Sequence, residues 1–189
     1  DMSEFIKKTE LPEKFFLTVG TIEPRKNYQS LIQAFAMFRE KNKDYHLVIV
    51  GKEGWGSEKT AIEELIRQNY LQKFVHFIGY ITTKNLVKLY NLAEAFIFPS
   101  YYEGFGMPPL EAMQCGCPVI SSFTSSMPEV LGEAAIYCNP ELPAEFANAM
   151  YEISTDNQKK LDIINKGRIQ SKKFSWKNSA EILKSTYHG

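Results

Sequence analysis

The sequence predicts an α/β fold: a Rossmann-like, doubly wound six-stranded parallel sheet with helices on both faces and a helical C-terminal tail. Short apolar runs bounded by glycine or proline alternate with stretches in which apolar residues recur at helical spacing. This alternation is typical of strands buried in a parallel sheet and of the helices that connect them. After Pro143 only helical patterns follow. The commonest strand order of such sheets, 3-2-1-4-5-6, is the order we expect.

The composition predicts one globular domain over residues 1–189. Hydrophobic residues make up 44% and charged residues 23% of the sequence, which is ordinary for a soluble α/β domain. The 22 basic and 22 acidic residues balance, which argues against a nucleic-acid partner. With no membrane-length apolar run and no secretory signal pattern, a cytoplasmic location is favoured. Three cysteines without a Cys-x-x-Cys pair read as reduced core thiols.

Each predicted element has its own local signal. The apolar runs that indicate strands are residues 15–19, 46–50, 75–78, 95–98, 119–120 and 134–137. Helices are expected after the potential N-caps Asn27, Ser57, Thr83 and Ser126, and from Pro108 to about Gly116. The tail is predicted to hold helices over residues 144–153, 157–173 (capped by Asp156) and 175–187. His76 lies within a predicted strand, so we interpret it as a hydrogen-bonded structural residue.

A glycine loop at residues 99–107 is the first candidate site. It follows a predicted strand and leads into a helix opened by Pro108 and Pro109, where the missing proline N–H has no helical partner. Glycines let a ligand approach the backbone closely, and the start of a helix favours an anion. A phosphate would fit, but Glu103 before the glycines and Glu111, expected in the first helical turn, would repel it. The loop therefore needs cations from elsewhere.

Arg25 and Lys26 can supply those cations. They stand in the loop after the first predicted strand, just before a helix start, and in isolation they would indicate only a solvated surface. In the expected strand order, however, the ligand crevice opens beside strands 1 and 4, at their carboxyl ends. The cationic loop and the loop with Glu103 would then be neighbours. Together they predict a phosphate-bearing nucleotide as the ligand.

Two other nucleotide-binding patterns do not fit. The glycine-rich turn at residues 51–56 lacks the spacing of a nucleotide-triphosphate loop. An NAD-dependent oxidoreductase should show Gly-x-Gly-x-x-Gly after a strand, but Gly104-Phe-Gly106 continues into Met-Pro-Pro. A non-catalytic nucleotide-binding module stays open as the alternative to an enzyme.

The motifs resemble a known family in their order along the chain. They are Val19-Gly-Thr-Ile-Glu-Pro-Arg-Lys-Asn27, Phe77-Ile-Gly-Tyr80, Pro99-Ser-Tyr-Tyr-Glu-Gly-Phe-Gly-Met-Pro-Pro-Leu-Glu-Ala-Met113, Gly116-Cys-Pro-Val119 and Pro128-Glu-Val130. This set is similar to the C-terminal, donor-binding domain of retaining group 1 (family 4) glycosyltransferases of the GT-B fold. The resemblance covers nearly the whole chain, and two glutamates eight positions apart around Gly-Phe-Gly are its most specific part.

The resemblance implies a role for each matching residue. The catalytic set is Glu103, which would accept hydrogen bonds from the transferred hexose, with Lys26 and Arg25, which would pair with the diphosphate. Glu111 would hold the ribose hydroxyls. The remaining donor-binding residues are Gly20 and Thr21, the loop residues Gly104, Phe105, Gly106 and Met107, and, near the base, Gly79, Tyr80 and Ile81. Thr21 departs from the family, because many members carry arginine there.

The resemblance also implies an activity and its partners. The enzyme would be a retaining hexosyltransferase that uses a GDP- or UDP-linked sugar, with a lean toward GDP-mannose, and needs no cofactor and no metal. No Asp-x-Asp is present for a metal. The acceptor would be a glycan or a lipid-linked glycan, bound by an N-terminal domain that this chain lacks and through which the enzyme could associate peripherally with a membrane. The isolated domain is expected to be inactive, with its last helix reaching toward the missing half.

Overall fold

The computed structural model describes residues 11–54 and 57–188. Its centre is a six-stranded sheet with the order β3-β2-β1-β4-β5-β6, which confirms the predicted order. Neighbouring strands pair in parallel. The strands are β1 (Phe15–Val19), β2 (His46–Val50), β3 (Val75–Gly79), β4 (Phe96–Phe98), β5 (Val119–Ser122) and β6 (Ala135–Cys138).

Helices connect the strands and extend the chain beyond the sheet, as predicted. They are α2 (Tyr28–Arg39), α3 (Glu58–Gln68), α4 (Thr83–Leu92), α5 (Met107–Gln114), α6 (Met127–Leu131), α7 (Pro143–Thr155), α8 (Asn157–Ser171) and α9 (Trp176–His188). A short 3-10 turn, Pro24–Lys26, precedes α2.

One of the predicted helix caps is shifted by one residue. Thr82, not Thr83, is the N-cap of α4, where its hydroxyl accepts a hydrogen bond from the Asn85 amide at 3.4 Å. Asp156 caps α8 as predicted, by accepting from the Lys159 amide at 2.9 Å. The other predicted caps stand at their helix starts but make no side-chain cap bond to the described residues; they are Asn27, Ser57 and Ser126.

The predicted place of Glu111 in the first turn of its helix is also wrong, because the helix starts one residue earlier than expected. Because α5 already begins at Met107, Glu111 is its fifth residue and lies in the second turn. A carboxylate in the second turn gains little from the helix dipole, since that interaction is confined to the first turn.

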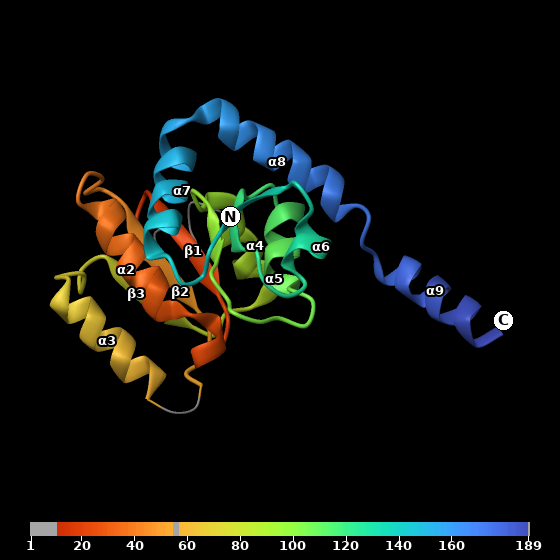
Figure 1. The fold of residues 1–189 in the computed structure, drawn as a ribbon, viewed down its shortest axis with the longest axis horizontal. Helices are drawn as coiled ribbons and strands as arrows, with labels where there is room; N and C mark the ends of the chain where they lie inside the picture. The colour runs from red at the N-terminus through yellow and green to blue at the C-terminus, as the bar shows by residue number, and fades with distance from the viewer. Residues whose placement is uncertain (1–10, 55–56, 189) are drawn as a thin grey trace.

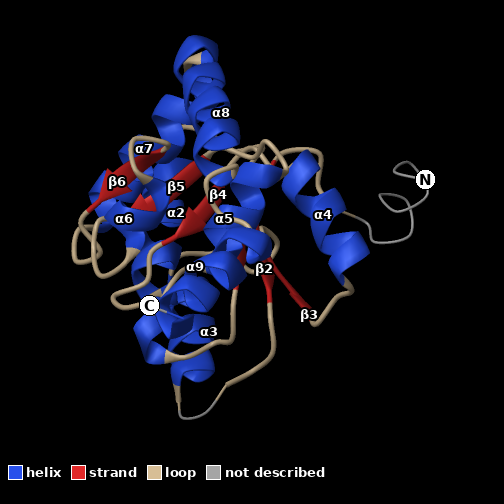
Figure 2. Ribbon diagram, turned by 90° about the vertical axis from the view of Figure 1, so that its right-hand side faces the viewer, coloured by secondary structure: helices blue, strands red, loops and turns tan. Residues whose placement is uncertain are grey.

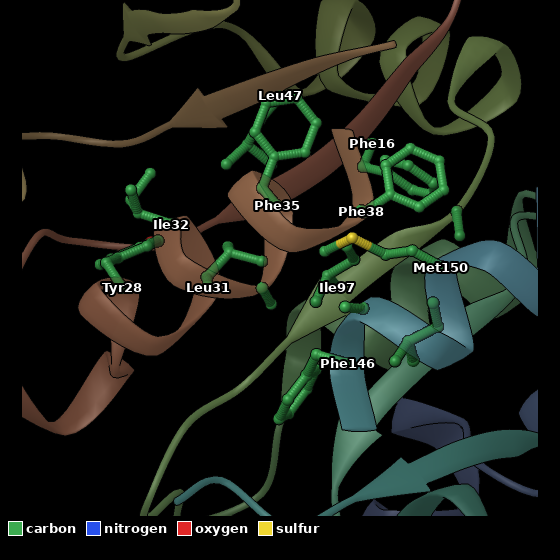
Figure 3. Packing of buried hydrophobic residues seen from close by; sticks show 14 of the residues in the cluster. Phe16, Tyr28, Leu31, Ile32, Phe35, Phe38, Leu47, Ile97, Phe146 and Met150 are labelled. Carbon is green, nitrogen blue, oxygen red and sulfur yellow. The ribbon is translucent and has the colours of Figure 1, made fainter. Parts of the chain in front are cut away.

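The core lies on both faces of the sheet because side chains alternate along each strand. From β1, Phe16 packs against Phe38 of α2 and Met150 of α7 (Figure 3), with the two phenylalanine ring centroids 5.1 Å apart. Its neighbours Phe15 and Leu17 belong to the cluster on the opposite face, which includes residues of α4, α5 and α6. The chain is thus doubly wound around one continuous sheet.

Helix α9 is the exception to this packing. It extends away from the sheet with the C-terminus at its far end (Figure 1), and in the view turned by 90° it lies in front of the sheet (Figure 2). Its large apolar side chains are exposed: Trp176 by 81%, Leu183 by 57% and Tyr187 by 82%. Among the described residues, none of the helices combines the length and apolarity that crossing a bilayer requires.

The two halves of the sheet meet where β1 pairs with β4. The amide of Leu17 donates to the carbonyl of Ala95 at 3.0 Å, and Leu17 is in register with Phe96. Both strands run in the same direction, so the loops after them leave the sheet at the same edge. Those loops are residues 20–27 and 99–106.

Candidate functional site

The two loops are in direct contact, as the sequence predicted. The amide of Tyr101 donates to the carbonyl of Arg25 at 2.8 Å. The side chain of Asn27 donates to the carbonyl of Pro99 at 3.1 Å and to that of Pro140 at 2.7 Å. Asn27 adopts a left-handed conformation, φ 55°, which asparagine tolerates better than most residues. Its amide therefore binds neighbouring loops instead of capping α2.

An ion cluster joins the loops. The Lys26 Nζ lies 2.6 Å from Glu103 Oε1, and the Arg25 Nη1 lies 2.8 Å from Glu103 Oε2. Arg25 also pairs with Glu23 at 2.5 Å. Lys26 is only 7% exposed and Glu103 only 9%. The two cations thus share one carboxylate, each on its own oxygen, in surroundings that screen charge less than water does.

The ammonium of Lys26 is held on several sides. It lies over the ring of Phe98, 4.8 Å from the centroid, where the negative face of the ring favours a cation. A Cβ added at Gly20 would lie 3.1 Å from Lys26 Cε and 3.2 Å from the Tyr28 hydroxyl. That hydroxyl donates to the carbonyl of Gly20 at 3.0 Å, and burial raises the pKa of Tyr28, so it stays a donor at neutral pH. Because Gly20 has no Cβ, the lysine side chain can lie against the backbone at the end of β1.

The glycine loop leads directly into α5. Gly106 is the N-cap residue with φ +90°, and a Cβ built there would lie 2.4 Å from Met127 Cε. A Cβ at Gly104 would meet nothing within 4 Å. Gly106 is thus required by its conformation and by close packing, whereas Gly104 leaves open space beside Glu103. The ring of Phe105 packs edge-on against Phe174, with centroids 5.6 Å apart.

Glu111 belongs to a second cluster, beside an apolar cavity of about 820 Å³ between α4, α5 and the start of α9. The hydroxyl of Tyr90 lies 3.3 Å from Glu111 Oε2 and 3.3 Å from the carbonyl of Pro108. Burial raises the pKa of Glu111, while the hydrogen bond from Tyr90 opposes that shift. The cavity wall also includes Leu86, Phe105, Met107 and Trp176.

The segment predicted to lie near the base follows β3. Gly79 ends that strand with φ +72°, and its carbonyl accepts from the amide of Gly51 at 3.0 Å. Tyr80 is 75% exposed, with the Lys52 ammonium 5.3 Å from its ring centroid. Ile81 is half-buried against the core of α4 to α6. Thr21, in the loop after β1, is also exposed. The roles of Thr21, Gly79, Tyr80 and Ile81 in binding a donor stay predictions.

Sequence reasoning missed the residues that support the site. Tyr28 and Tyr90 hold Gly20 and Glu111, and Ser125 and Ser126 hold the main chain of Glu103. The only sequence signal for the serines is a run of hydroxyl residues after β5, a pattern that is common in loops. Within residues 11–54 and 57–188, no three or more His, Cys, Asp or Glu side chains group in a way that could hold a metal ion.

The arrangement suits an anionic ligand that also carries hydroxyl groups. Cations and helix-start amides bind phosphate oxygens. A carboxylate offers about four lone-pair sites, so Glu103 can keep both cations and still accept from a hydroxyl. Because Lys26 has three N–H donors, it can hold Glu103 and a phosphate oxygen together.

Known proteins share the sequence and the fold. The sequence profile described as "Glycosyl transferases group 1" matches residues 1–170. O-antigen chain mannosyltransferase B of Escherichia coli is 36% identical over 166 residues, which are 87% of this chain but 43% of that protein. Sucrose-phosphate synthase from Thermosynechococcus elongatus superposes with a TM-score of 0.85 at 29% identity, over 98% of this chain and 48% of that one.

A third comparison concerns a single domain. The C-terminal domain of a glycosyl transferase group 1 family protein (LpcC) from Francisella tularensis superposes with a TM-score of 0.80, over 92% of each chain. At 23% identity this likeness shows the fold alone. The chain thus spans less than half the length of the E. coli relative but 92% of a domain-sized structure.

Proposed function

This chain belongs to the group 1 glycosyltransferases, and from that premise we propose that it is the domain that binds the nucleotide-sugar donor for hexose transfer. The observation that carries the proposal is the meeting of Lys26 and Arg25 with Glu103 where the loops after β1 and β4 touch. A diphosphate would find two cations there, beside the amides of Gly106 and Met107 at the start of α5. The hexose would lie against Glu103.

The nucleoside would extend from the diphosphate toward α4. Glu111 would accept hydrogen bonds from the ribose hydroxyls, and the hydroxyl of Tyr90 would hold the carboxylate in place. The base would lie near Gly79, Tyr80 and Ile81, where main-chain groups could read it. The apolar cavity beside Glu111 offers the surroundings that a nucleoside needs.

The chemical step we propose breaks the bond between the anomeric carbon and the leaving diphosphate. As the sugar becomes cation-like, negative charge grows on the leaving oxygen, and Lys26 and Arg25 would stabilise it without a metal. The leaving phosphate would take the proton of the acceptor hydroxyl, and the new bond would keep the anomeric configuration. No general base from this domain is then needed.

We further propose GDP-mannose as the donor and a glycan or lipid-linked glycan as the acceptor. The name of the E. coli relative, an O-antigen chain mannosyltransferase, supports mannose as the transferred sugar and a glycan as the acceptor. Since this chain spans 43% of that relative, a second domain would bind the acceptor and complete the site. This chain alone would then bind the donor but transfer nothing.

Calorimetric titration of this chain with GDP, UDP and ADP, each with and without magnesium, tests the donor site. We expect GDP to bind best, with no dependence on magnesium. Replacing Lys26 by alanine removes a charge-assisted contact of about 1.5–3 kcal/mol, so the affinity for GDP should fall roughly 10- to 100-fold. The matched control is Lys59→Ala, which removes a partly exposed lysine paired with Glu53 at 2.8 Å.

The outcomes separate the possible functions. Binding that is equal for all nucleotides, requires magnesium or survives Lys26→Ala would contradict the proposed site. Transfer of mannose by the full-length enzyme, lost in Glu103→Ala, would exclude a non-catalytic nucleotide-binding module. The anomeric configuration of the product, read by NMR, tests retention.

A further inference from the structure

We propose that the loop between β5 and α6 is a positioning device for Glu103, and that Ser125 is its central residue. This inference rests on the proposed function, in which Glu103 receives the hydroxyls of the hexose. We call residues 122–126 the hydroxyl clamp. Its members bind the main chain of the loop after β4 at two points, one at Ser100 and one at Glu103.

The contact at Glu103 is made by two serines of the clamp. The hydroxyl of Ser125 donates to the carbonyl of Glu103 at 2.6 Å and accepts from the amide of the same residue at 3.3 Å. The hydroxyl of Ser126 donates to that carbonyl at 3.0 Å. Both polar groups of the Glu103 main chain are therefore satisfied by side chains from a segment 22 residues away. The side-chain carboxylate of Glu103, by contrast, pairs with Lys26 and Arg25.

The contact at Ser100 fixes the start of the same loop. The hydroxyl of Ser122 donates to the carbonyl of Ser100 at 2.6 Å. The hydroxyl of Thr124 lies 3.1 Å from that carbonyl and 3.2 Å from the Ser122 hydroxyl. The loop is thus held on both sides of the exposed Tyr101 and Tyr102.

The conformation of Ser125 supports a role beyond filling a turn. Its φ is +59°, in the left-handed region that disfavours residues with a Cβ. Glycine would suit the backbone better, but it has no hydroxyl to bridge the amide and carbonyl of Glu103. The strained serine therefore persists where its hydroxyl makes two contacts to the main chain of a proposed catalytic residue.

The clamp matters because the carboxylate must meet the hexose in one orientation. If the Glu103 main chain moved, the distances from its oxygens to Lys26 and to the sugar would change together, whereas the diphosphate contacts of Arg25 and Lys26 would remain. Loss of the clamp should therefore weaken binding of the sugar nucleotide more than binding of the nucleotide alone.

The test compares Ser125→Gly and Ser125→Ala in this chain. Glycine relieves the left-handed strain, whereas alanine keeps it, and both remove the hydroxyl. We expect the two variants to differ in thermal stability, with glycine the more stable, yet to share two losses. The amide of Glu103 should exchange its hydrogen faster by NMR. Affinity for GDP-mannose should fall about 5- to 10-fold, while affinity for GDP changes less than about 2-fold.

Tyr70→Gly is the matched control, because Tyr70 also has a left-handed φ of +56° but is 84% exposed. It should change stability without changing either readout. Unchanged exchange at Glu103, or an equal loss of affinity for GDP and GDP-mannose, would overturn the inference. If the wild-type chain binds no nucleotide, the proposed function fails and the role in sugar binding fails with it, while the exchange rate still reports whether the clamp holds Glu103.

Discussion

Replacing Glu103 by glutamine should destabilise the chain more than replacing its partner Lys26 by methionine. In Glu103→Gln, the side-chain oxygen can face Lys26 or Arg25 but not both, so the new NH₂ group must face a cation that is now 2.6–2.8 Å away. Lys26, 7% exposed, also loses its carboxylate. In Lys26→Met, by contrast, Glu103 keeps Arg25, which is partly solvated.

The magnitudes follow from the burial of the pair. Removing one partner of a buried ion pair costs about 3–5 kcal/mol when the other charge is left without compensation. We expect about 3 kcal/mol for Glu103→Gln and about 1–2 kcal/mol for Lys26→Met, whose carboxylate stays paired. At about 2–4 °C per kcal/mol for a chain of this size, the first change should lower the melting temperature by about 6–12 °C.

Thermal and urea unfolding of the two variants check this order. Lys59→Met, which breaks an exposed pair with Glu53, is the control and should leave the midpoint unchanged within error. A rise in the melting temperature of Glu103→Gln would refute the reasoning. It would mean that the cluster is held together at the expense of stability, as functional sites sometimes are.

Three further predictions follow from other contacts. Gly106→Ala should destabilise the chain by about 1–3 kcal/mol in urea unfolding, because its Cβ would lie 2.4 Å from Met127 Cε. The same substitution should cost less when it is measured in a Met127→Ala background, although Met127→Ala itself opens a cavity in the core. The ring nitrogens of His46 and His76 lie 2.8 Å apart, and burial lowers the pKa values of both side chains. Their contribution to stability is therefore complete above the unfolded pKa of about 6.5, and it is lost as the pH falls through the lower folded pKa values. Urea midpoints measured from neutral to acidic pH should show this fall, and His76→Gln should reduce it. Finally, Glu111→Ala should lower the affinity for GDP about 10-fold in calorimetry, because Glu111 is proposed to bind the ribose hydroxyls. The affinity for inorganic pyrophosphate, which has no ribose, should not change, and an equal loss for both ligands would contradict the assignment of Glu111 to the ribose.

The strand order and the meeting of the two loops could be predicted because they depend on topology. Once apolar runs alternate with helical patterns, the carboxyl ends of strands 1 and 4 must share one edge in the commonest order. That rule predicts that Arg25 and Lys26 lie close to Glu103, although 77 residues separate Lys26 from Glu103 in the sequence. His76 was also predicted correctly as a hydrogen-bonded residue, since its ring contacts that of His46.

Local hydrogen-bond partners could not be predicted in the same way. Asn27 has the side chain of a good N-cap, but carbonyls from two distant loops take its donors. Glu111 was predicted in the first turn but lies in the second, because α5 begins at Met107, one residue before the prolines that signal its start. The clamp at Ser125 depends on a partner 22 residues earlier, and only the folded sheet brings the two together.

Asn27 links the proposed donor site to a turn that is not part of it. Asn27 directly follows Lys26, and its side-chain amide donates to the carbonyl of Pro140 in the turn after β6. A change in that remote turn can therefore alter the lysine without altering any group that faces the ligand. Substitutions around residues 140–142 could therefore change the affinity of the proposed site while every residue proposed to bind the donor stays the same.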